Sequence, residues 1–226
     1  MTRPHVLLSV AVSVDGYIDD GGAARFPLSN AEDFDHVDRL RAESDAILVG
    51  AGTVRRDNPR LLVNDPGRRA ARVGAGRPEH PLKVTVTGSG DLPPDAAFWH
   101  HGGEKRVYTT ESGAPKVSAA LAGLASVACL GPEVDFAALL DDLGALGVGR
   151  LMVEGGGRVH TAFLASGLAD EIRMAVAPML IGRAAAPRFV HPAAFPGGPA
   201  RRFHLDGVEV LGDVAVLRYF PKRAAT

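Results

Sequence analysis

Leu151–Gly157, with the sequence Leu-Met-Val-Glu-Gly-Gly-Gly, indicates the fold class of this chain. Its first four residues have the composition of a buried strand that ends in a carboxylate, and three glycines follow at once. Val159, Phe163 and Ser166 then recur at helical spacing. A strand, a glycine turn and a helix start together present backbone N–H groups to a phosphate. Because Glu154 ends the strand, it is expected to face the same crevice. The stretch therefore predicts an α/β protein that binds a nucleotide.

The bulk composition is that of an ordinary globular protein. The chain has 226 residues, of which 46% are hydrophobic and 23% are charged, so it can bury a substantial core. Its formal net charge of -1 gives no reason to expect a nucleic-acid or membrane partner. The N-terminal residues lack a signal-peptide layout and no apolar run is long enough to span a bilayer, so a cytoplasmic protein is expected.

The metal-binding and redox-active residue types are sparse. Cys129 is the single cysteine, which excludes an internal disulfide and a cysteine-ligated zinc site. Its apolar neighbours predict a small buried side chain. The eight histidines show no metal-ligand spacing, so we predict no metal site.

Strands alternate with helices along most of the chain. The apolar patterns predict strands at 6–14, 46–49, 82–87, 105–109, 125–130, 150–153 and 169–178, and helices at 30–43, 50–57, 114–122 and 136–146. The 30–43 helix should begin with a capping box over 29–32. Residues 208–211 and 214–219 flank Gly212-Asp213 and predict a terminal hairpin. This order predicts one domain, an α/β sandwich with a mostly parallel sheet and antiparallel edges. Apolar edge strands are expected near 170–177 and 214–219, where a second copy would pair or pack.

Candidate site residues follow two of the predicted strands. Glycine clusters stand at 50–52 and 155–157, but neither matches the dinucleotide fingerprint, so each alone is also explained by a tight turn. Thr53 and Asp57 lie four residues apart and share a helix face. They either hold a ribose or nicotinamide, or belong to a short surface helix. Glu154 favours a functional role, because a carboxylate that ends an apolar strand is costly unless it is paired or serves a site.

Arginines stand at two further places of interest. Arg41 lies in the last turn of the 30–43 helix. Its guanidinium either binds a substrate phosphate or interacts with the negative C-terminal end of the helix dipole. Taken alone, the second interpretation is favoured. Segment 66–81 is rich in Pro, Gly and Ala and predicts a loop. Its arginines are expected to be solvated, with contact to a 2′-phosphate as the alternative; they are Arg68, Arg69, Arg72 and Arg77.

Five motifs occur in an order that resembles a known family. They are Ser13–Ile18, Leu40–Val54, Asp57–Leu61, Glu154–Gly157 and Ala177–Gly182. Together they resemble the reductase domain of bacterial riboflavin biosynthesis over nearly the whole chain. The resemblance implies one dihydrofolate-reductase-like domain over 1–226: a three-layer α/β/α sandwich with a mostly parallel central sheet and an antiparallel C-terminal hairpin. It also implies a cytoplasmic homodimer with a small-molecule substrate.

The resemblance further implies the reaction. The family uses NADPH to reduce the ribose of 5-amino-6-(5-phosphoribosylamino)uracil to a ribityl chain, by hydride transfer to C1′ of the opened imine form. The protein then needs to hold the two reacting carbons about 3–3.5 Å apart and to supply electrostatics.

Position by position, the resemblance assigns a role to each candidate residue. The cofactor residues it implies are Ala11, Thr53, Asp57, Gly155, Gly156, Gly157, Arg158 and Val159, with 156–162 holding the phosphates at a helix N-terminus. The substrate residues it implies are Arg41, Leu61 and Glu154. Glu154 would stabilise positive charge at the imine, and Asp57 would orient the cofactor or the substrate hydroxyls, so these two are the catalytic candidates.

The substrate side of this pattern has several departures. Ser9 stands where the family often has Lys, and Arg25 and Pro27 stand where Ser-x-Trp is common. Asn64 stands where an Arg helps to bind substrate. Two alternatives therefore stay open. One is a paralogous reductase that acts on dihydrofolate or another pterin-like imine. The other is a nucleotide-binding sensor without turnover, against which the presence of both Asp57 and Glu154 argues.

Overall fold

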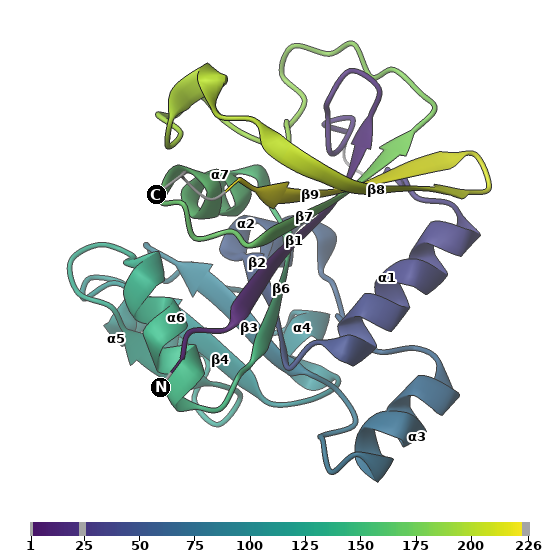
Figure 1. Cartoon of the computed structure of the whole chain (residues 1–226). Helices are drawn as coiled ribbons and strands as arrows, with labels where there is room; N and C mark the ends of the chain where they lie inside the picture. The colour runs from purple at the N-terminus through teal and green to yellow at the C-terminus, as the bar shows by residue number, and fades with distance from the viewer. Residues whose placement is uncertain (1, 23–25, 223–226) are drawn as a thin grey trace. The chain divides into compact units, whose positions relative to one another are not determined.

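The predicted alternation of strands and helices is present in the computed structural model, which describes residues 2–22 and 26–222 (Figure 1). Arg25, one of the departures noted above, lies outside the described residues. The strands are β1 (His5–Ser13), β2 (Ala46–Gly50), β3 (Leu82–Thr87), β4 (Lys105–Thr109), β5 (Ser126–Cys129), β6 (Arg150–Gly155), β7 (Glu171–Ala177), β8 (Phe203–Leu211) and β9 (Val214–Pro221). The α-helices are α1 (Ala31–Glu43), α2 (Ala51–Asp57), α3 (Pro66–Gly74), α4 (Ala97–His100), α5 (Ala114–Ala120), α6 (Phe136–Ala145) and α7 (Gly157–Ala165).

The sheet confirms the predicted fold class. Within the described residues its hydrogen-bonded order is β5-β4-β3-β2-β6-β1-β7-β9-β8. The β1–β7, β2–β3, β3–β4 and β4–β5 pairs are parallel. The β7–β9 and β8–β9 pairs are antiparallel, as expected for a C-terminal hairpin. Across the part of the chain that the structure describes, no helix is both long and apolar enough to cross a membrane.

The chain forms two compact units. Unit 1 comprises Met1–His5 and Asp38–Met152, and unit 2 comprises Val6–Val37 and Val153–Thr226. The prediction of one reductase domain over 1–226 stays a prediction.

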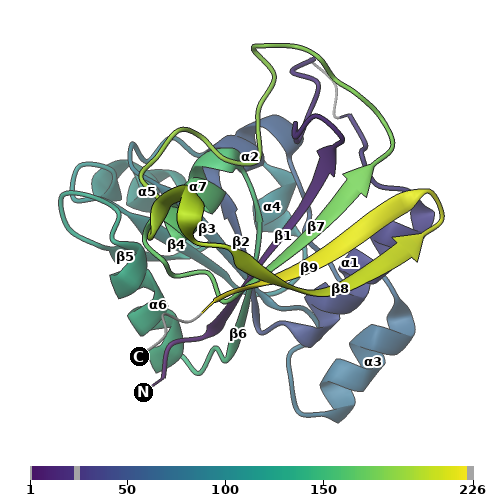
Figure 2. The same ribbon diagram turned by 45° about the horizontal axis from the view of Figure 1, so that its top comes forward.

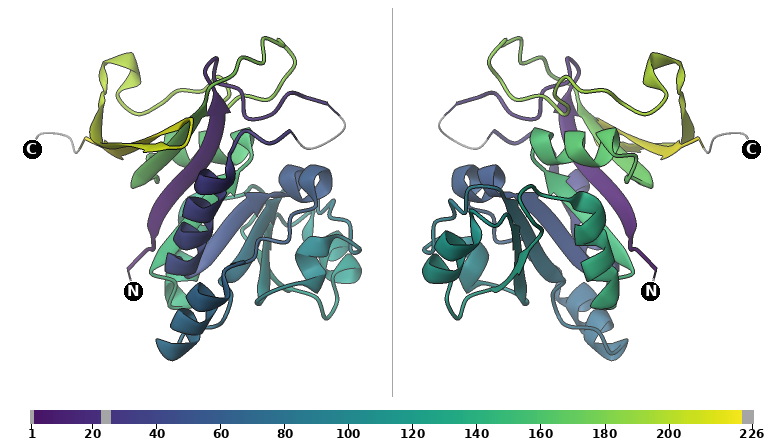
Figure 3. Two further views of the ribbon diagram at one scale, coloured as in Figure 1. Left: turned by 90° about the vertical axis from the view of Figure 1, so that its right-hand side faces the viewer. Right: turned by 90° about the vertical axis from the view of Figure 1, so that its left-hand side faces the viewer.

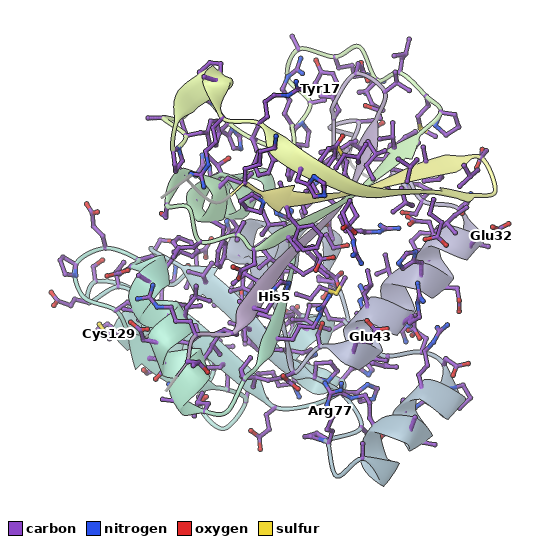
Figure 4. All side chains as sticks on the ribbon, viewed as in Figure 1. His5, Tyr17, Glu32, Glu43, Arg77 and Cys129 are labelled. Carbon is purple, nitrogen blue, oxygen red and sulfur yellow. The ribbon has the colours of Figure 1, made fainter. Side chains whose placement is uncertain are left out.

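In unit 1, the prediction of a loop at 66–81 is wrong, because residues 66–74 form α3. Asp65 caps this helix by accepting a hydrogen bond from the Arg68 amide, and Pro66 occupies its first turn. Arg72 is buried and donates to the carbonyls of Ala42 and Ser44, each at 2.7 Å. Arg77 reaches the same helix end (Figure 4), where its Nη2 donates to the Glu43 carbonyl and to Asp45. Two of the four arginines that suggested a solvated segment, Arg72 and Arg77, therefore bind carbonyls at the C-terminal end of α1.

The prediction that Cys129 is buried is also wrong. Cys129 is exposed, at the end of β5 (Figure 4). β5 is the last strand at its end of the sheet, and both of its terminal residues are exposed. An apolar stretch of sequence does not reveal that its strand lies at a sheet edge, so the expectation of burial failed here.

In unit 2, strands β1, β7, β9 and β8 lie side by side in this order (Figure 2). The edge strand is therefore β8, and the prediction of edges near 170–177 and 214–219 is wrong. β7 and β8 are both antiparallel to β9, so the connection between them leaves the C-terminal end of β7 and reaches β8 at the opposite end of these strands (Figure 3). Asn30 caps α1 by accepting from the Asp33 amide at 2.9 Å, so the cap lies one residue later than the predicted box.

A buried ion pair joins α1 to β7 within unit 2. The Arg173 guanidinium donates to the Asp33 carboxylate, and both side chains are at least 96% buried. Removing one partner would leave the other charge in the interior, so such a pair fixes how the first turns of α1 pack on the sheet.

His160 gives unit 2 a pH-dependent stability. The imidazole is fully buried on α7, 5.2 Å from the Phe189 ring between centroids, and neither ring nitrogen has a hydrogen-bond partner among the described residues. Burial lowers the pKa of His160 to about 4. Since the unfolded chain binds this proton near pH 6.5, we expect stability to fall as the pH drops from 6.5 to 4. The loss amounts to about 3 kcal/mol, at roughly 1.4 kcal/mol per pKa unit.

Urea denaturation at several pH values measures this effect. His160→Leu should flatten the profile between pH 6.5 and 4, whereas the same change at the exposed His101 should leave it unchanged. A wild-type stability that is constant across this window would contradict the assignment.

Candidate functional site

The unit 1 part of the candidate site is the turn from β2 into α2. β2 is buried throughout, and Gly50 leaves it in an extended conformation to cap α2. Val54 and Ala51 anchor α2 in the core. Thr53 and Asp57, one helical turn apart, are partly exposed, so the predicted short helix and its shared face are confirmed.

The loop after α2 has an unusual backbone. Asn58 ends the helix in the left-handed region (φ 43°, ψ 52°), and its Oδ1 accepts from the Ala97 amide at 2.6 Å. Leu61 also has a positive φ, 47°, and is 4% exposed. Among the described residues these are the two positions other than glycine with positive φ. A leucine adopts this conformation only where its surroundings enforce it, and such residues gather at functional sites.

Side chains hold the backbone of this loop, which we define as residues 58–65. It belongs to no strand or helix, so its polar groups need other partners. Arg41 Nη1 donates to the Leu62 carbonyl at 3.2 Å. His80 Nδ1 accepts from the Val63 amide at 3.3 Å. Asp38 accepts from the amide of Asn64 at 2.5 Å. Arg41 therefore reaches the loop that contains Leu61, and a contact with substrate stays a prediction.

The unit 2 part of the site is the turn from β6 into α7. Leu151, Met152 and Val153 are fully buried, whereas Glu154 is partly exposed. Gly155 has φ 142°, and the peptide bond between Gly155 and Gly156 is cis. Gly156 caps α7 without a side-chain hydrogen bond. A glycine cap leaves the first-turn amides available to an anion, as the predicted phosphate site requires.

A segment distant in sequence covers the start of α7. A Cβ added to Gly157 would lie 2.4 Å from the Arg188 carbonyl oxygen and 3.1 Å from His191 Nε2. Thr161 Oγ1 donates to the Gly157 carbonyl at 2.6 Å and accepts from the His191 amide at 2.9 Å. Residues 188–191 thus lie against the first turn of α7. This contact could not be predicted from the sequence, because residues 188–191 lie in an irregular segment.

Asp15 brings two of the family-like motifs together. Its carboxylate accepts from Ser13 Oγ at 2.6 Å and from the amides of Ile181 and Gly182. The Ser13 hydroxyl and these amides lower the pKa of Asp15 to about 2. The turn after β1 is therefore tied to the segment after β7. Ala11, the cofactor residue predicted on β1, is partly exposed and lies opposite Ala175 of β7.

The predicted residues divide between the two units. Arg41, Thr53, Asp57 and Leu61 belong to unit 1, and Ala11, Glu154 and the 155–159 turn belong to unit 2. Asp57, Glu154 and Arg41 each take part in interactions with other groups. Lys83, described below, was not recognised from the sequence, because a lysine in an apolar strand resembles a surface-facing position.

Together, the sheet and its two strand–glycine–helix turns define an α/β protein with a dihydrofolate-reductase-like fold. The model of the RibD C-terminal domain matches residues 4–217, and the chain belongs to this family.

Three similar proteins illustrate the family. A 2,5-diamino-6-ribosylamino-4(3H)-pyrimidinone 5′-phosphate reductase from Archaeoglobus fulgidus is 36% identical over 212 residues, which cover 93% of this chain and 95% of that protein. A reductase of the same name from Methanothermobacter thermautotrophicus is 36% identical over 181 residues, 80% of each chain. The crystal structure of a pyrimidine reductase-like protein from Corynebacterium diphtheriae has a TM-score of 0.79 at 22% identity, covering 98% of this chain and 93% of the other, and shows the shared fold.

The close packing at Gly157 is tested by substitution. We expect Gly157→Ala to destabilise the protein by about 1–3 kcal/mol, because the methyl group would overlap the Arg188 carbonyl. Gly52→Ala is the matched control, since a Cβ at Gly52 meets nothing within 4 Å and glycine is unfavourable within a helix. The midpoint temperature of thermal unfolding should fall for Gly157→Ala. For Gly52→Ala it should rise or stay unchanged. Equal losses would contradict the packing argument.

Proposed function

We propose that this protein is an NADPH-dependent reductase of the riboflavin pathway that reduces the ribosylamino group of a pyrimidine phosphate to the ribitylamino group. The observation that carries the proposal is the 36% identity to a reductase of this kind over 93% of the chain. The family relation implies an oxidoreductase with a nicotinamide cofactor. NADPH in particular follows from the resemblance in the sequence motifs.

The preferred pyrimidine is the 2,5-diamino-4(3H)-pyrimidinone, because the relatives of similar length are named for it. The second candidate is 5-amino-6-(5-phosphoribosylamino)uracil, which the resemblance implies for the bacterial reductase domain. Both carry the same phosphoribosylamino group and differ at ring position 2. The departures at Ser9, Pro27 and Asn64 are compatible with a change in which pyrimidine is bound.

The turn into α7 fits the phosphates of a dinucleotide. Gly156, the N-cap residue of α7, has no side chain that would bind the first-turn amides. The amides at the start of the 156–162 segment therefore hold the phosphates, at the positive end of the helix, since those of Val159 and His160 already bind the Gly156 carbonyl. Thr53 and Asp57, on one face of α2, orient the cofactor.

The remaining residues act on the substrate. When bound, the cofactor supplies a hydride for C1′ of the open-chain imine. Arg41 and Leu61 contact the phosphorylated pyrimidine substrate. Glu154 places its carboxylate near the imine nitrogen, which carries positive charge. Asp57 accepts a hydrogen bond from a hydroxyl group of the cofactor or of the substrate.

Oxidation of NADPH at 340 nm tests the proposal, with the diaminopyrimidinone, the uracil and dihydrofolate as parallel acceptors and NADH as the alternative donor. We expect turnover of the diaminopyrimidinone, slower turnover of the uracil and none of dihydrofolate. Turnover of dihydrofolate alone would identify a paralogous reductase. NADPH binding without turnover of any acceptor would favour a sensor.

Glu154→Gln separates catalysis from cofactor binding. We expect kcat to fall roughly 10²-fold, because the neutral amide stabilises developing positive charge less well, while the Kd for NADPH changes little. Glu133→Gln, at an exposed loop position, is the control and should leave both constants unchanged. A raised Kd for NADPH with kcat unchanged would contradict the role of Glu154.

We also propose that the protein is a homodimer and that β8 lies at its interface. A β-bulge between Leu205 and Gly207 adds one residue to the strand and so shifts the alternation of its side chains by one position. As a result, four exposed apolar side chains on either side of the bulge share one face of β8. They are Phe203, Leu205, Val208 and Val210, with exposed fractions of 42, 46, 61 and 71%. This apolar stripe continues into a cavity of about 770 Å³ whose lining includes Ile172, Met174 and Tyr219.

A second copy of the chain fits this surface. Long apolar edge strands attract another strand, and large exposed apolar patches mark interaction sites. β8 is also self-complementary, because an antiparallel pair about a twofold axis between residues 206 and 207 places Phe203 opposite the second copy's residue 210. The same axis places Leu205 opposite residue 208.

Charge substitutions in β8 test the dimer. We expect the Val208→Glu/Val210→Glu double variant to be monomeric at micromolar concentration, because burying these carboxylates is costly. Val73→Glu is the control, since Val73 is 57% exposed on α3 of unit 1. Light scattering coupled to size exclusion gives the mass of each. A wild-type monomer, or a double variant that stays dimeric, would overturn the assignment.

A further inference from the structure

Lys83 is a buried cation in unit 1 that the proposed reaction leaves without a role. It lies on β3, opposite Lys105 of β4 in the register, and is 0% exposed. Its ammonium donates to the backbone carbonyls of Phe98 and of Arg60, the latter at 3.2 Å. It also lies 4.7 Å from the centroid of the Phe98 ring. Within the described residues, no carboxylate forms an ion pair with it.

An ammonium in this position is costly, because burial removes its water and the carbonyls return only part of the lost solvation. Burial, and secondarily the charge of Lys105, lower the pKa of Lys83 to about 7. His80 is the other titratable group whose charge interacts with Lys83. The register neighbour of Lys83 on β2 is the buried Ile47, and the Phe98 ring lies beside the ammonium, so an apolar side chain would pack well here. The cation is therefore not explained by the stability of the core.

The Arg60 carbonyl belongs to the peptide that leads directly into Leu61, whose φ is 47°. On the other side of Leu61, the guanidinium of Arg41 holds the Leu62 carbonyl. Leu61 thus lies between two carbonyls that are each bound by a cation. Left-handed backbone is unfavourable for leucine and persists only when neighbouring groups fix the flanking peptides.

We propose that Lys83 is a positioning residue for the reaction: its ammonium fixes the Arg60–Leu61 peptide and so holds Leu61 in the conformation that meets the pyrimidine. The identity of the substrate in this statement rests on the proposed function. The effect of Lys83 on loop 58–65 does not, since it follows from contacts within unit 1.

Hydrogen exchange and steady-state kinetics of Lys83→Met test the two parts separately. Met has a similar length and no charge, so the variant should unfold at a urea concentration equal to or above that of wild type. Amides of loop 58–65 should exchange at least about tenfold faster, the factor expected when a charged hydrogen bond is lost. The KM for the pyrimidine should rise by a similar factor, with the Kd for NADPH unchanged. Lys105→Met is the matched control, because the Lys105 ammonium contacts the Gly102 carbonyl and not the loop.

Each outcome has a distinct meaning. Unchanged exchange in loop 58–65 would overturn the positioning role, whatever the activity. Faster exchange in a protein whose wild type does not reduce the pyrimidine would keep the loop contact and reject the proposed function. If Lys83→Met does not fold, the same measurements are made on Lys83→Gln. A loss of stability without a change in the KM for the pyrimidine would then show that Lys83 has only a structural role.

Discussion

The peptide groups of residues 58–65 form no strand or helix, and the site in unit 1 depends on how their hydrogen bonds are satisfied. Asp38 binds the Asn64 amide, Arg41 the Leu62 carbonyl, and His80 the Val63 amide. A buried backbone group without a hydrogen-bond partner is costly. Each of these hydrogen bonds therefore restricts both the side chain and the loop backbone that it joins. The result is a rigid segment in which a leucine is held with positive φ.

In unit 2, irregular segments are held in place by the Asp15 carboxylate and by close packing at Gly157. Asp15 binds the amides of Ile181 and Gly182, which would otherwise lack partners after β7. Gly157 allows residues 188–191 to approach the first turn of α7 so closely that no side chain fits between them. In both units, irregular segments far apart in the sequence are positioned at the ends of strands.

Much of the fold could be predicted from the sequence, because apolar periodicity reports local structure directly. The strands around Leu48 and Val153, the short helix with Thr53 and Asp57, and the terminal hairpin are present as predicted. The failures share a cause. Helix α3 was missed because its arginines suggested a solvated segment, although Arg72 is buried against the end of α1, and Cys129 was misplaced because edge and central strands have similar composition. These properties depend on contacts between distant segments, which one sequence does not display.

Buried charge is the feature of this protein that local sequence patterns conceal most. Asp33 and Arg173 neutralise each other inside unit 2, so their burial is compensated and determines packing. Lys83 has only carbonyls, so its burial is compensated less completely and its core position would accept an apolar residue. A lysine kept under these conditions is better explained by the peptide that it holds than by the core that surrounds it. Since that peptide precedes Leu61, the cost of burying the cation is connected with the conformation of loop 58–65 rather than with the stability of the sheet.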